Sequence, residues 1–275
     1  AQTVQLAPAD DLAAALSTAA AGTVVELAPG DHGALALRGL QGTADAPITL
    51  RSADPGDPAR ITGLDLRGAA FLRLEGLVFD YTFSPGDPGN LRPFSVSDST
   101  GIAFVGNLFD GDVAQGVSAT DDGFPTAFGL SVRGSTEITV QDNEIRGFYR
   151  GLAVSRTADL QVTGNDLHGI RMDGMNFAEV QRVEIAENRI HDFARSLASG
   201  DHSDMIQFWT NGTGSPSTDI VIRDNILNAG NGWYTQSIFM RNDQVDRGLA
   251  GDEMFYRNVT ITGNVIINAH LHGIT

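Results

Sequence analysis

Short runs in which apolar and polar residues alternate recur along most of the chain, and most of them lead to an asparagine. Residues 138–143, for example, read ITVQDN. Alternation with a period of two predicts a β-strand with one buried face. The repeated asparagines are Asn107, Asn143, Asn165, Asn188, Asn225 and Asn264, and an earlier copy of the unit has Leu77 in this position.

The spacing of these asparagines predicts how the strands are arranged. Two steps are 22 and 23 residues long (143 to 165 and 165 to 188), and the others are 36, 37 and 39. A period near 22 that tolerates loop-sized insertions predicts a parallel β-solenoid, in which each coil stacks on the previous one. Asparagine at the bend suits a left-handed or bridge conformation, and stacked asparagines can bond to one another along the axis.

A second column of strands lies between the asparagines and repeats in the same register. An ordinary antiparallel sandwich would not explain this recurrence, so we expect an all-β fold, a parallel β-helix. Period-two alternation places one set of side chains inward. This set comprises Leu130, Leu152, Met175, Ile206, Ile238 and Ile274, together with Val132, Val154, Phe177, Phe208 and Met240.

The N-terminal part predicts a helix and three further strands. Residues 10–20 are rich in alanine and leucine after two aspartates, which predicts an N-terminal capping helix. Strands are expected near 23–27, 34–37 and 48–50, with turn residues between them. We expect a single domain over residues 1–275. Because the chain ends within a strand repeat, we also expect the natural protein to continue beyond Thr275.

Composition narrows the classes of function. The chain has 34 acidic and 18 basic residues, and every basic one is arginine because no lysine is present. A net charge of −16 argues against a nucleic-acid partner. No apolar run is long enough to predict a membrane span, and we expect a monomer. The absence of cysteine excludes thiolate chemistry. An acidic substrate would need a local arginine or metal site.

The pattern resembles the right-handed parallel β-helix of the pectate-lyase superfold. Residues 22–30, 46–51 and 71–79 are similar to the opening of polysaccharide lyase family six, the chondroitinase B and alginate lyase family. Residues 201–209 resemble β-helix modules of secreted calcium-repeat exopolysaccharide glycanases. The resemblance implies a secreted protein with a polysaccharide substrate. Family six uses a catalytic lysine, which this chain lacks, and holds calcium at outward positions that here read Asn176, Gln207 and Phe239.

Stacking of the coils predicts a shared wall of polar side chains. Successive rungs lie about 4.8 Å apart, so residues that open successive strands become neighbours. The residues that open the strands are Arg150, Asp173, Asp204, Gln236 and His272. Outward positions and the preceding loops add Asn176, Gln207, Trp209, Arg241, Asp201, His202 and Tyr234. We expect Gln207, Asn176, Gln236, Arg150 and His272 to contact the substrate.

These residue types suit β-elimination from a uronate-containing polysaccharide. His202 would be the base, oriented by Asp201 or Asp204, since a carboxylate beside an imidazole raises its basicity. Arg241, with Arg150, would neutralise the uronate carboxylate. Tyr234 would protonate the leaving oxygen. Trp209 could stack on a sugar or merely cover a loop, and Arg241 could instead form a surface ion pair.

Other interpretations use the same residues. Asp173, Asp201 and Asp204 could hold calcium, which prefers carboxylate oxygens, or could be the acid and base of a glycoside hydrolase. A C5 epimerase would re-protonate the opposite face of the sugar. A glycan-binding adhesin would have no catalysis. We expect a lyase.

Overall fold

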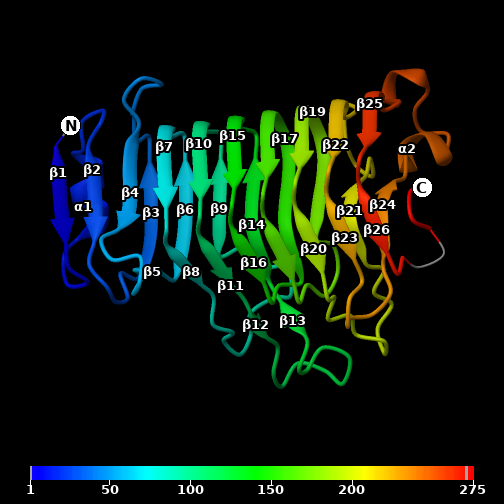
Figure 1. The fold of residues 1–275 in the computed structure, drawn as a ribbon, viewed down its shortest axis with the longest axis horizontal. Helices are drawn as coiled ribbons and strands as arrows, with labels where there is room; N and C mark the ends of the chain where they lie inside the picture. Colours follow the sequence, from blue (N-terminus) through cyan, green and yellow to red (C-terminus); the bar gives the residue numbers. More distant parts are fainter. Residues whose placement is uncertain (1, 270–271) are drawn as a thin grey trace.

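The computed structural model describes residues 2–269 and 272–275, and its strands stack along one axis into a long coil (Figure 1). The main strand pairings are all parallel. Three ladders, here called A, B and C, run along the axis. The predicted parallel β-helix is therefore confirmed.

Ladder A contains β1 (Thr3–Leu6), β2 (Val24–Leu27), β4 (Ile48–Ser52), β7 (Ala70–Glu75), β10 (Thr100–Val105), β15 (Thr136–Gln141), β22 (Thr218–Arg223) and β25 (Arg257–Thr262). Ladder B contains β3 (Ala34–Arg38), β6 (Gly63–Arg67), β9 (Phe94–Ser97), β14 (Phe128–Arg133), β21 (Asp204–Phe208) and β24 (Gln236–Met240). Ladder C contains β5 (Arg60–Ile61), β8 (Val78–Asp80), β11 (Leu108–Asp110), β16 (Glu144–Arg146), β18 (Asp166–His168), β20 (Arg189–His191), β23 (Ile226–Asn228) and β26 (Val265–Ile267).

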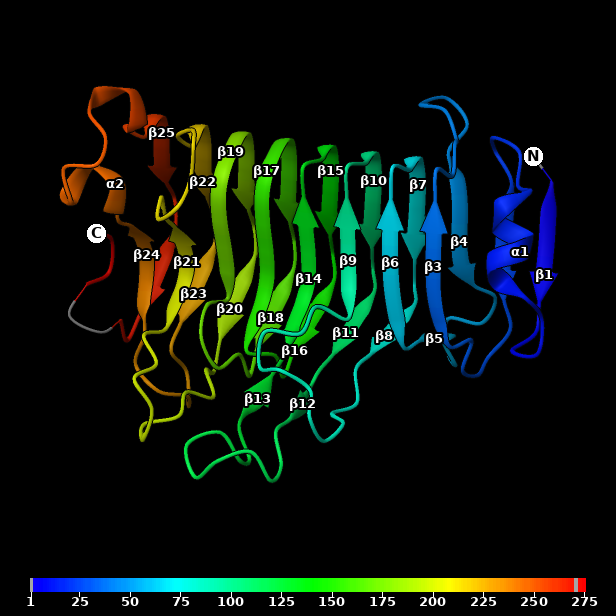
Figure 2. The ribbon, with the colours of Figure 1, turned by 180° about the vertical axis from the view of Figure 1, so that it is seen from behind.

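Two long strands belong to both ladder A and ladder B. They are β17 (Arg150–Thr163) and β19 (Met175–Ala186). The first half of β17 pairs with β14 and its second half pairs with β15. Ladder B faces the viewer in Figure 2, where the chain between β11 and β14 projects below the coil and carries the short antiparallel pair β12 (Asp112–Val113) and β13 (Pro125–Thr126).

The N-terminal helix is shorter than the sequence predicts but has the expected position. It is α1 (Leu12–Ser17), and the Asp11 side chain caps it by accepting from the backbone N–H of Ala14 at 2.9 Å. Its apolar face buries Leu12 and Leu16. Near the other end are a short helix, α2 (Asp243–Asp246), and a 3-10 turn, η1 (Asp252–Met254). Among the described helices, none has the length and apolar character needed to cross a bilayer.

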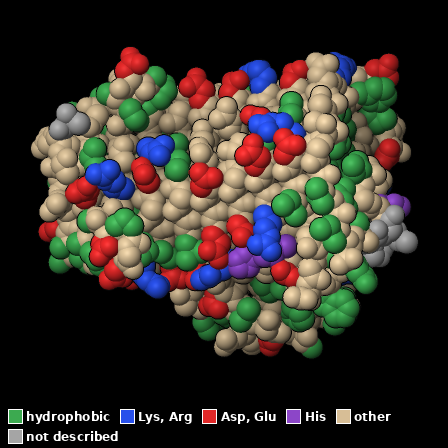
Figure 3. Space-filling view, viewed as in Figure 1, with side chains coloured by type: hydrophobic (Ala, Val, Ile, Leu, Met, Phe, Trp, Pro, Cys, Tyr) green, Lys and Arg blue, Asp and Glu red, His purple; other side chains and the backbone are tan. Residues whose placement is uncertain are grey.

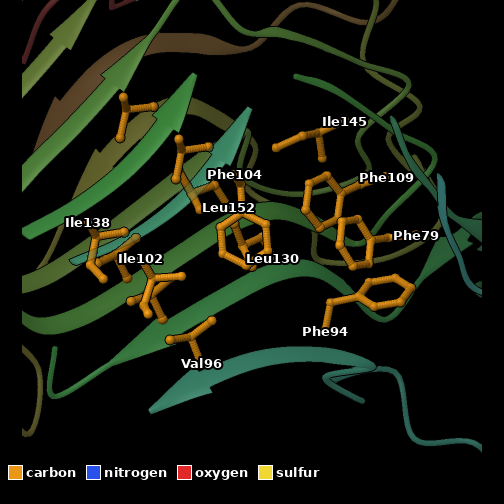
Figure 4. Close-up of a cluster of buried hydrophobic side chains, with 14 of the residues drawn as sticks. Phe79, Phe94, Val96, Ile102, Phe104, Phe109, Leu130, Ile138, Ile145 and Leu152 are labelled. Atoms are coloured by element: carbon orange, nitrogen blue, oxygen red, sulfur yellow. The ribbon is translucent and has the colours of Figure 1, made fainter. Parts of the chain in front are cut away.

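Inward side chains fill the coil as the alternation predicts. Leu152 pairs with Met175, Met175 with Ile206, and Ile206 with Ile238, and all four are fully buried. Phenylalanines occupy the same interior, as Figure 4 shows; the rings of Phe79 and Phe109 stack with centroids 4.6 Å apart.

Two residues of the predicted inward set are less buried. Met240 is partly buried, and Ile274, on the last described rung, is 54% exposed. No described coil covers Ile274 on its outer side, which explains its exposure.

The predicted asparagine ladder is present in the corner between ladders A and C. Oδ1 of Asn165 accepts from both the backbone N–H and Nδ2 of Asn143, each at 3.0 Å. Oδ1 of Asn188 accepts from the same two groups of Asn165, each at 2.9 Å. At the N-terminal end of the ladder, the backbone N–H of Leu77 donates to Oδ1 of Asn107. These bonds satisfy buried polar groups that the bend would otherwise leave unpaired.

Of the two conformations expected for the asparagines, left-handed or bridge, the left-handed one is wrong. The left-handed residue is the one before each asparagine, with φ of 54° at Asp142, 67° at Gly164 and 58° at Glu187. The preceding residue makes the bend, which leaves the N–H of the asparagine pointing along the axis toward the next Oδ1.

Replacing Asn165 by alanine should destabilise the protein. The change removes the acceptor for the buried N–H of Asn143 and the donor to Val140 O. Since each buried unpaired group costs about 1–3 kcal/mol, we expect the free energy of unfolding to fall by roughly 2–4 kcal/mol in urea titrations. Asn264→Ala is the control, because its bonds are only partly buried and water can replace them. Equal small losses in both variants would contradict this role of the ladder.

Candidate active site

The predicted column of polar residues exists at the start of the ladder B strands. Arg150 pairs with Phe128, and Asp204 pairs with Gln236. Between them, the backbone N–H of Gly151 donates to Asp173 O and that of Gly174 donates to Asp204 O. A Cβ on either glycine would lie 2.6 Å from a carbonyl oxygen of the next coil, so only glycine lets these rungs stack.

The two column aspartates are fully buried. Oδ2 of Asp173 lies 2.9 Å from Nε of Arg150 and accepts from Nδ2 of Asn176 at 2.9 Å. Burial raises the pKa of Asp173 to about 6, although Arg150 and Asn176 act in the opposite direction. Burial, and then the charge of Asp173, raise the pKa of Asp204 to about 8. Both effects favour the protonated form of Asp204.

His202 lies over Asp204 and is the exposed member of this pair. Its Nδ1 is 3.2 Å from Oδ2 of Asp204, and its side chain is 53% exposed while that of Asp204 is not exposed at all. The amide nitrogen of Gln236 lies 2.5 Å from Nε2 of His202. The centroid of the His202 ring is 5.5 Å from that of the Phe239 ring. Two successive coils thus place one imidazole on one buried carboxyl.

The backbone next to His202 is held by the neighbouring coils. Ser203 Oγ donates to Arg171 O at 2.9 Å, and Ser203 O accepts from the backbone N–H of Gln236 at 3.2 Å. These bonds fix the end of the loop that carries His202, so the imidazole is attached to a rigid rung.

A row of amides continues the site along the outward positions of ladder B. Nδ2 of Asn176 donates to Oε1 of Gln207 at 2.6 Å, and Nε1 of Trp209 donates to Oδ1 of Asn176 at 2.6 Å. Trp209 is only partly exposed, and this bond fixes the orientation of its ring. The structure therefore joins Trp209 to Asp173 through Asn176.

Asp201 does not orient His202. Its carboxylate binds Arg171, whose Nε donates to Oδ2 at 2.7 Å, and both side chains are buried. Arg171 also contacts Asp121 at 2.8 Å and so ties two loops together. Of the two orienting residues that the sequence suggested, only Asp204 lies beside the imidazole.

The predicted calcium trio is wrong. Because Asp201 is bound to Arg171, it does not join Asp173 and Asp204. Within residues 2–269 and 272–275, no group of three or more histidine, aspartate or glutamate side chains could hold a metal ion. Arg150 already supplies a cation to Asp173, and burial favours the protonated form of Asp204. These residues do not fit the proposed calcium site.

Three further predicted residues lie outside this network. Nε of Arg241 is 3.3 Å from both Asp243 and Asp246, so the surface ion pair is the interpretation that the structure supports. Tyr234 is 60% exposed in the loop before β24. His272 is exposed one rung beyond Gln236, where Ile274 bridges Ile238.

Two arginines that the sequence analysis did not select, Arg92 and Arg133, lie in the coils before that of Arg150. The guanidinium carbon of Arg92 lies 4.9 Å from the centroid of the Phe128 ring, and that of Arg150 lies 5.4 Å from it. Burial, and then the charges of Arg150 and Arg133, lower the pKa of Arg92. Arg92 stands two residues before Phe94, as Arg150 stands two before Leu152. That register was the signal that could have identified it.

Comparisons with known proteins agree with the fold. A family profile described as "Right handed beta helix region" matches residues 124–275. An alginate lyase from Paenibacillus sp. str. FPU-7 is similar at 16% identity and a TM-score of 0.58, over 99% of this chain and 97% of that one. The pectate lyase Pel9A is similar at 11% identity and a TM-score of 0.54, over 98% of this chain and 78% of that one.

A mutant of the periplasmic alginate epimerase AlgG is also similar, at 11% identity and a TM-score of 0.50, over 90% of this chain and 61% of that one. No curated protein matches the sequence. At these identities the structural likeness shows the fold alone.

The buried aspartates predict a pH dependence of stability. An acid whose pKa is higher in the folded protein binds more protons when folded, so the free energy of unfolding falls as pH rises. For Asp204 this fall extends from its ordinary value of 3.8 to about 8, and Asp173 contributes in the same direction up to about 6. We expect the wild type to lose stability relative to Asp204→Asn between pH 5 and pH 9 in denaturant titrations. Parallel curves would contradict the raised pKa.

Proposed function

We propose a function for this chain, which belongs to the right-handed β-helix family: it cleaves an acidic polysaccharide by β-elimination, with His202 as the base. The observation that carries the proposal is the half-exposed imidazole of His202 over the fully buried carboxyl of Asp204. Trp209 lies farther along the same face, joined to the column through Asn176 and Asp173. Because the proposed substrate is a polymer, and similar structures include lyases and a periplasmic epimerase, we propose that the protein acts outside the cytoplasm.

The elimination needs one base and one acid. His202 would take the proton alpha to the uronate carboxyl group, the electron pair of that C–H bond would form a C=C bond, and the glycosidic C–O bond would break. The leaving oxygen would then take up a proton, for which Tyr234 is the proposed donor. An oriented base contributes roughly 10²–10⁴-fold to the rate.

Each ring nitrogen of His202 has a partner, and these two partners would affect its action as a base. The Gln236 amide donates to Nε2 of His202, so an entering sugar would have to displace it from the ring. Asp204 would orient the ring through Nδ1 and, when ionised, would stabilise the positive charge that the imidazole gains. Asp204 is therefore a positioning residue in this mechanism.

Arg150 replaces Arg241 as the best candidate to neutralise the uronate carboxylate. Its guanidinium lies near the Phe128 and Tyr149 rings, is fixed by Asp173, and remains 27% exposed. A planar guanidinium can bind a carboxylate through two parallel bonds, which stabilises the charge that develops after proton removal. Arg241 is already bound to two aspartates.

Burial argues against the hydrolase alternative. Asp173 and Asp204 lie on adjacent rungs, about 4.8 Å apart along the axis, a spacing near that of a retaining glycosidase. Both side chains are fully buried, however, so neither can contact a glycosidic oxygen in this arrangement. A C5 epimerase would use the same exposed base and differ only in which face of the sugar is re-protonated.

Replacing His202 by alanine should lower the rate at least about 100-fold, because the variant loses the base. The measurement is the ultraviolet absorbance of unsaturated sugar ends released from a panel of uronate-containing polysaccharides. His168→Ala is the matched control, since His168 lies on ladder C and contacts Glu144. Full activity of the His202 variant, or reducing ends without unsaturated ends from the wild type, would refute the proposal.

A further inference from the structure

Arg92 and Arg150 both lie over the Phe128 ring, on the N-terminal side of the His202–Asp204 pair. Arg133, at the other end of β14, adds a third positive charge on the same ladder, and the three arginines are called the arginine cluster here. The charges of Arg133 and Arg150 act on Arg92. In the register of ladder B, position 92 lies one rung from Phe128 and two from Arg150. The cluster therefore covers three consecutive coils.

This concentration of positive charge is unusual for a chain with a net charge of −16. On ladder A, arginines sit beside acids, such as Arg182 with Asp159 and Arg223 with Glu184, and Figure 3 shows blue side chains against red ones on that face. Among the described residues, no carboxylate pairs with Arg92 or Arg133, and Arg150 pairs only with Asp173. Like charges held together without acids favour an anionic ligand between them.

The floor beneath the cluster contains a polar group without a partner. Ser131 lies on the outward side of β14, is 3% exposed, and its Oγ has no hydrogen-bond partner in the described part of the chain. Its neighbours in register, Ser95 and Ala153, are small. The Ser131 hydroxyl is thus a donor without a partner among the described residues, between rungs that carry only small side chains at this position.

A cavity borders the N-terminal end of the arginine cluster. This cavity of about 370 Å³ borders Arg92 and Ser95, and Arg67 and Asp65 line its far side. Small side chains, such as Ala34 and Ala36 of β3, leave it open. The polar path along ladder B thus extends well beyond the coils that carry His202.

We propose that the arginine cluster binds an anionic substituent, a carboxylate or a sulfate ester, of the same polysaccharide at a sugar distant from the bond that is cleaved. The inference rests on the proposed function and extends it to the substrate, which must carry negative charges at more than one sugar. Arg92 and Asp204 are four rungs apart, which is roughly 19 Å along the axis at the usual strand spacing. The polymer would therefore lie along the axis of the coil and span several sugars.

The test measures binding without cleavage. In the His202→Ala background, calorimetry would follow the binding of alginate, chondroitin sulfate and dextran, which are a polyuronate, a sulfated polyuronate and a neutral polymer. We expect at least one polyanion to bind, and Arg92→Gln or Arg133→Gln to weaken it about tenfold, the loss expected for one charge-assisted bond. The weakened variants should also depend less on salt. Comparison of alginate with chondroitin sulfate separates carboxylate from sulfate recognition.

The matched control is Arg189→Gln, an exposed arginine on ladder C whose only acidic contact within residues 2–269 and 272–275 is Asp166 at 4.0 Å. It should leave binding unchanged. Since neither Arg92 nor Arg133 forms an ion pair with any residue that the structure describes, their variants should keep the wild-type unfolding midpoint, and measuring this midpoint verifies that they fold.

Binding of neither polyanion, or polyanion binding that both glutamine variants leave intact, would overturn the inference. Arginine-dependent binding of a polymer that the wild type fails to convert to unsaturated ends would instead refute the proposed lyase and leave the inference standing.

Discussion

The register of parallel pairing between successive coils is the constraint on which the whole structure depends. Side chains alternate between the two faces of a strand, so a slip of one residue would move the inward set to the surface. The asparagine ladder opposes such a slip, because each Oδ1 accepts two bonds from the coil before it. The same register turns residues that are distant in sequence, such as Asp173 and Asp204, into neighbours.

The candidate site follows from that stacking. Two aspartates on adjacent rungs are removed from water, and mutual repulsion adds to burial in raising the pKa of Asp204. His202 lies against this buried carboxyl and is half exposed, so it is the member of the pair that a ligand at the surface can contact. Toward the N-terminus the same column changes from acids to arginines, so one face of the coil combines a base with positive charge in an otherwise acidic protein.

The repeated pattern of strands and asparagines explains which features of the fold and of the site could be predicted from the sequence. The asparagine steps identified the coils, and the strand register correctly stacked Arg150, Asp173, Asp204 and Gln236. The failures lie in loops and long side chains, whose directions repetition does not determine. Asp201 turned toward Arg171, and Arg241 toward the acids of α2. Arg92 was missed because Phe128 interrupts the polar column.

Disulfide trapping tests the register of the site most directly, since the chain has no cysteine of its own. Gln207 and Phe239 are partners on adjacent outward positions, at a spacing that a disulfide can span. Mild oxidation of the double variant Gln207→Cys, Phe239→Cys should give one intramolecular disulfide, whereas Gln207→Cys with Arg241→Cys should remain reduced. Cross-linking of the second pair in preference to the first would contradict the stacking and, with it, the site built on it.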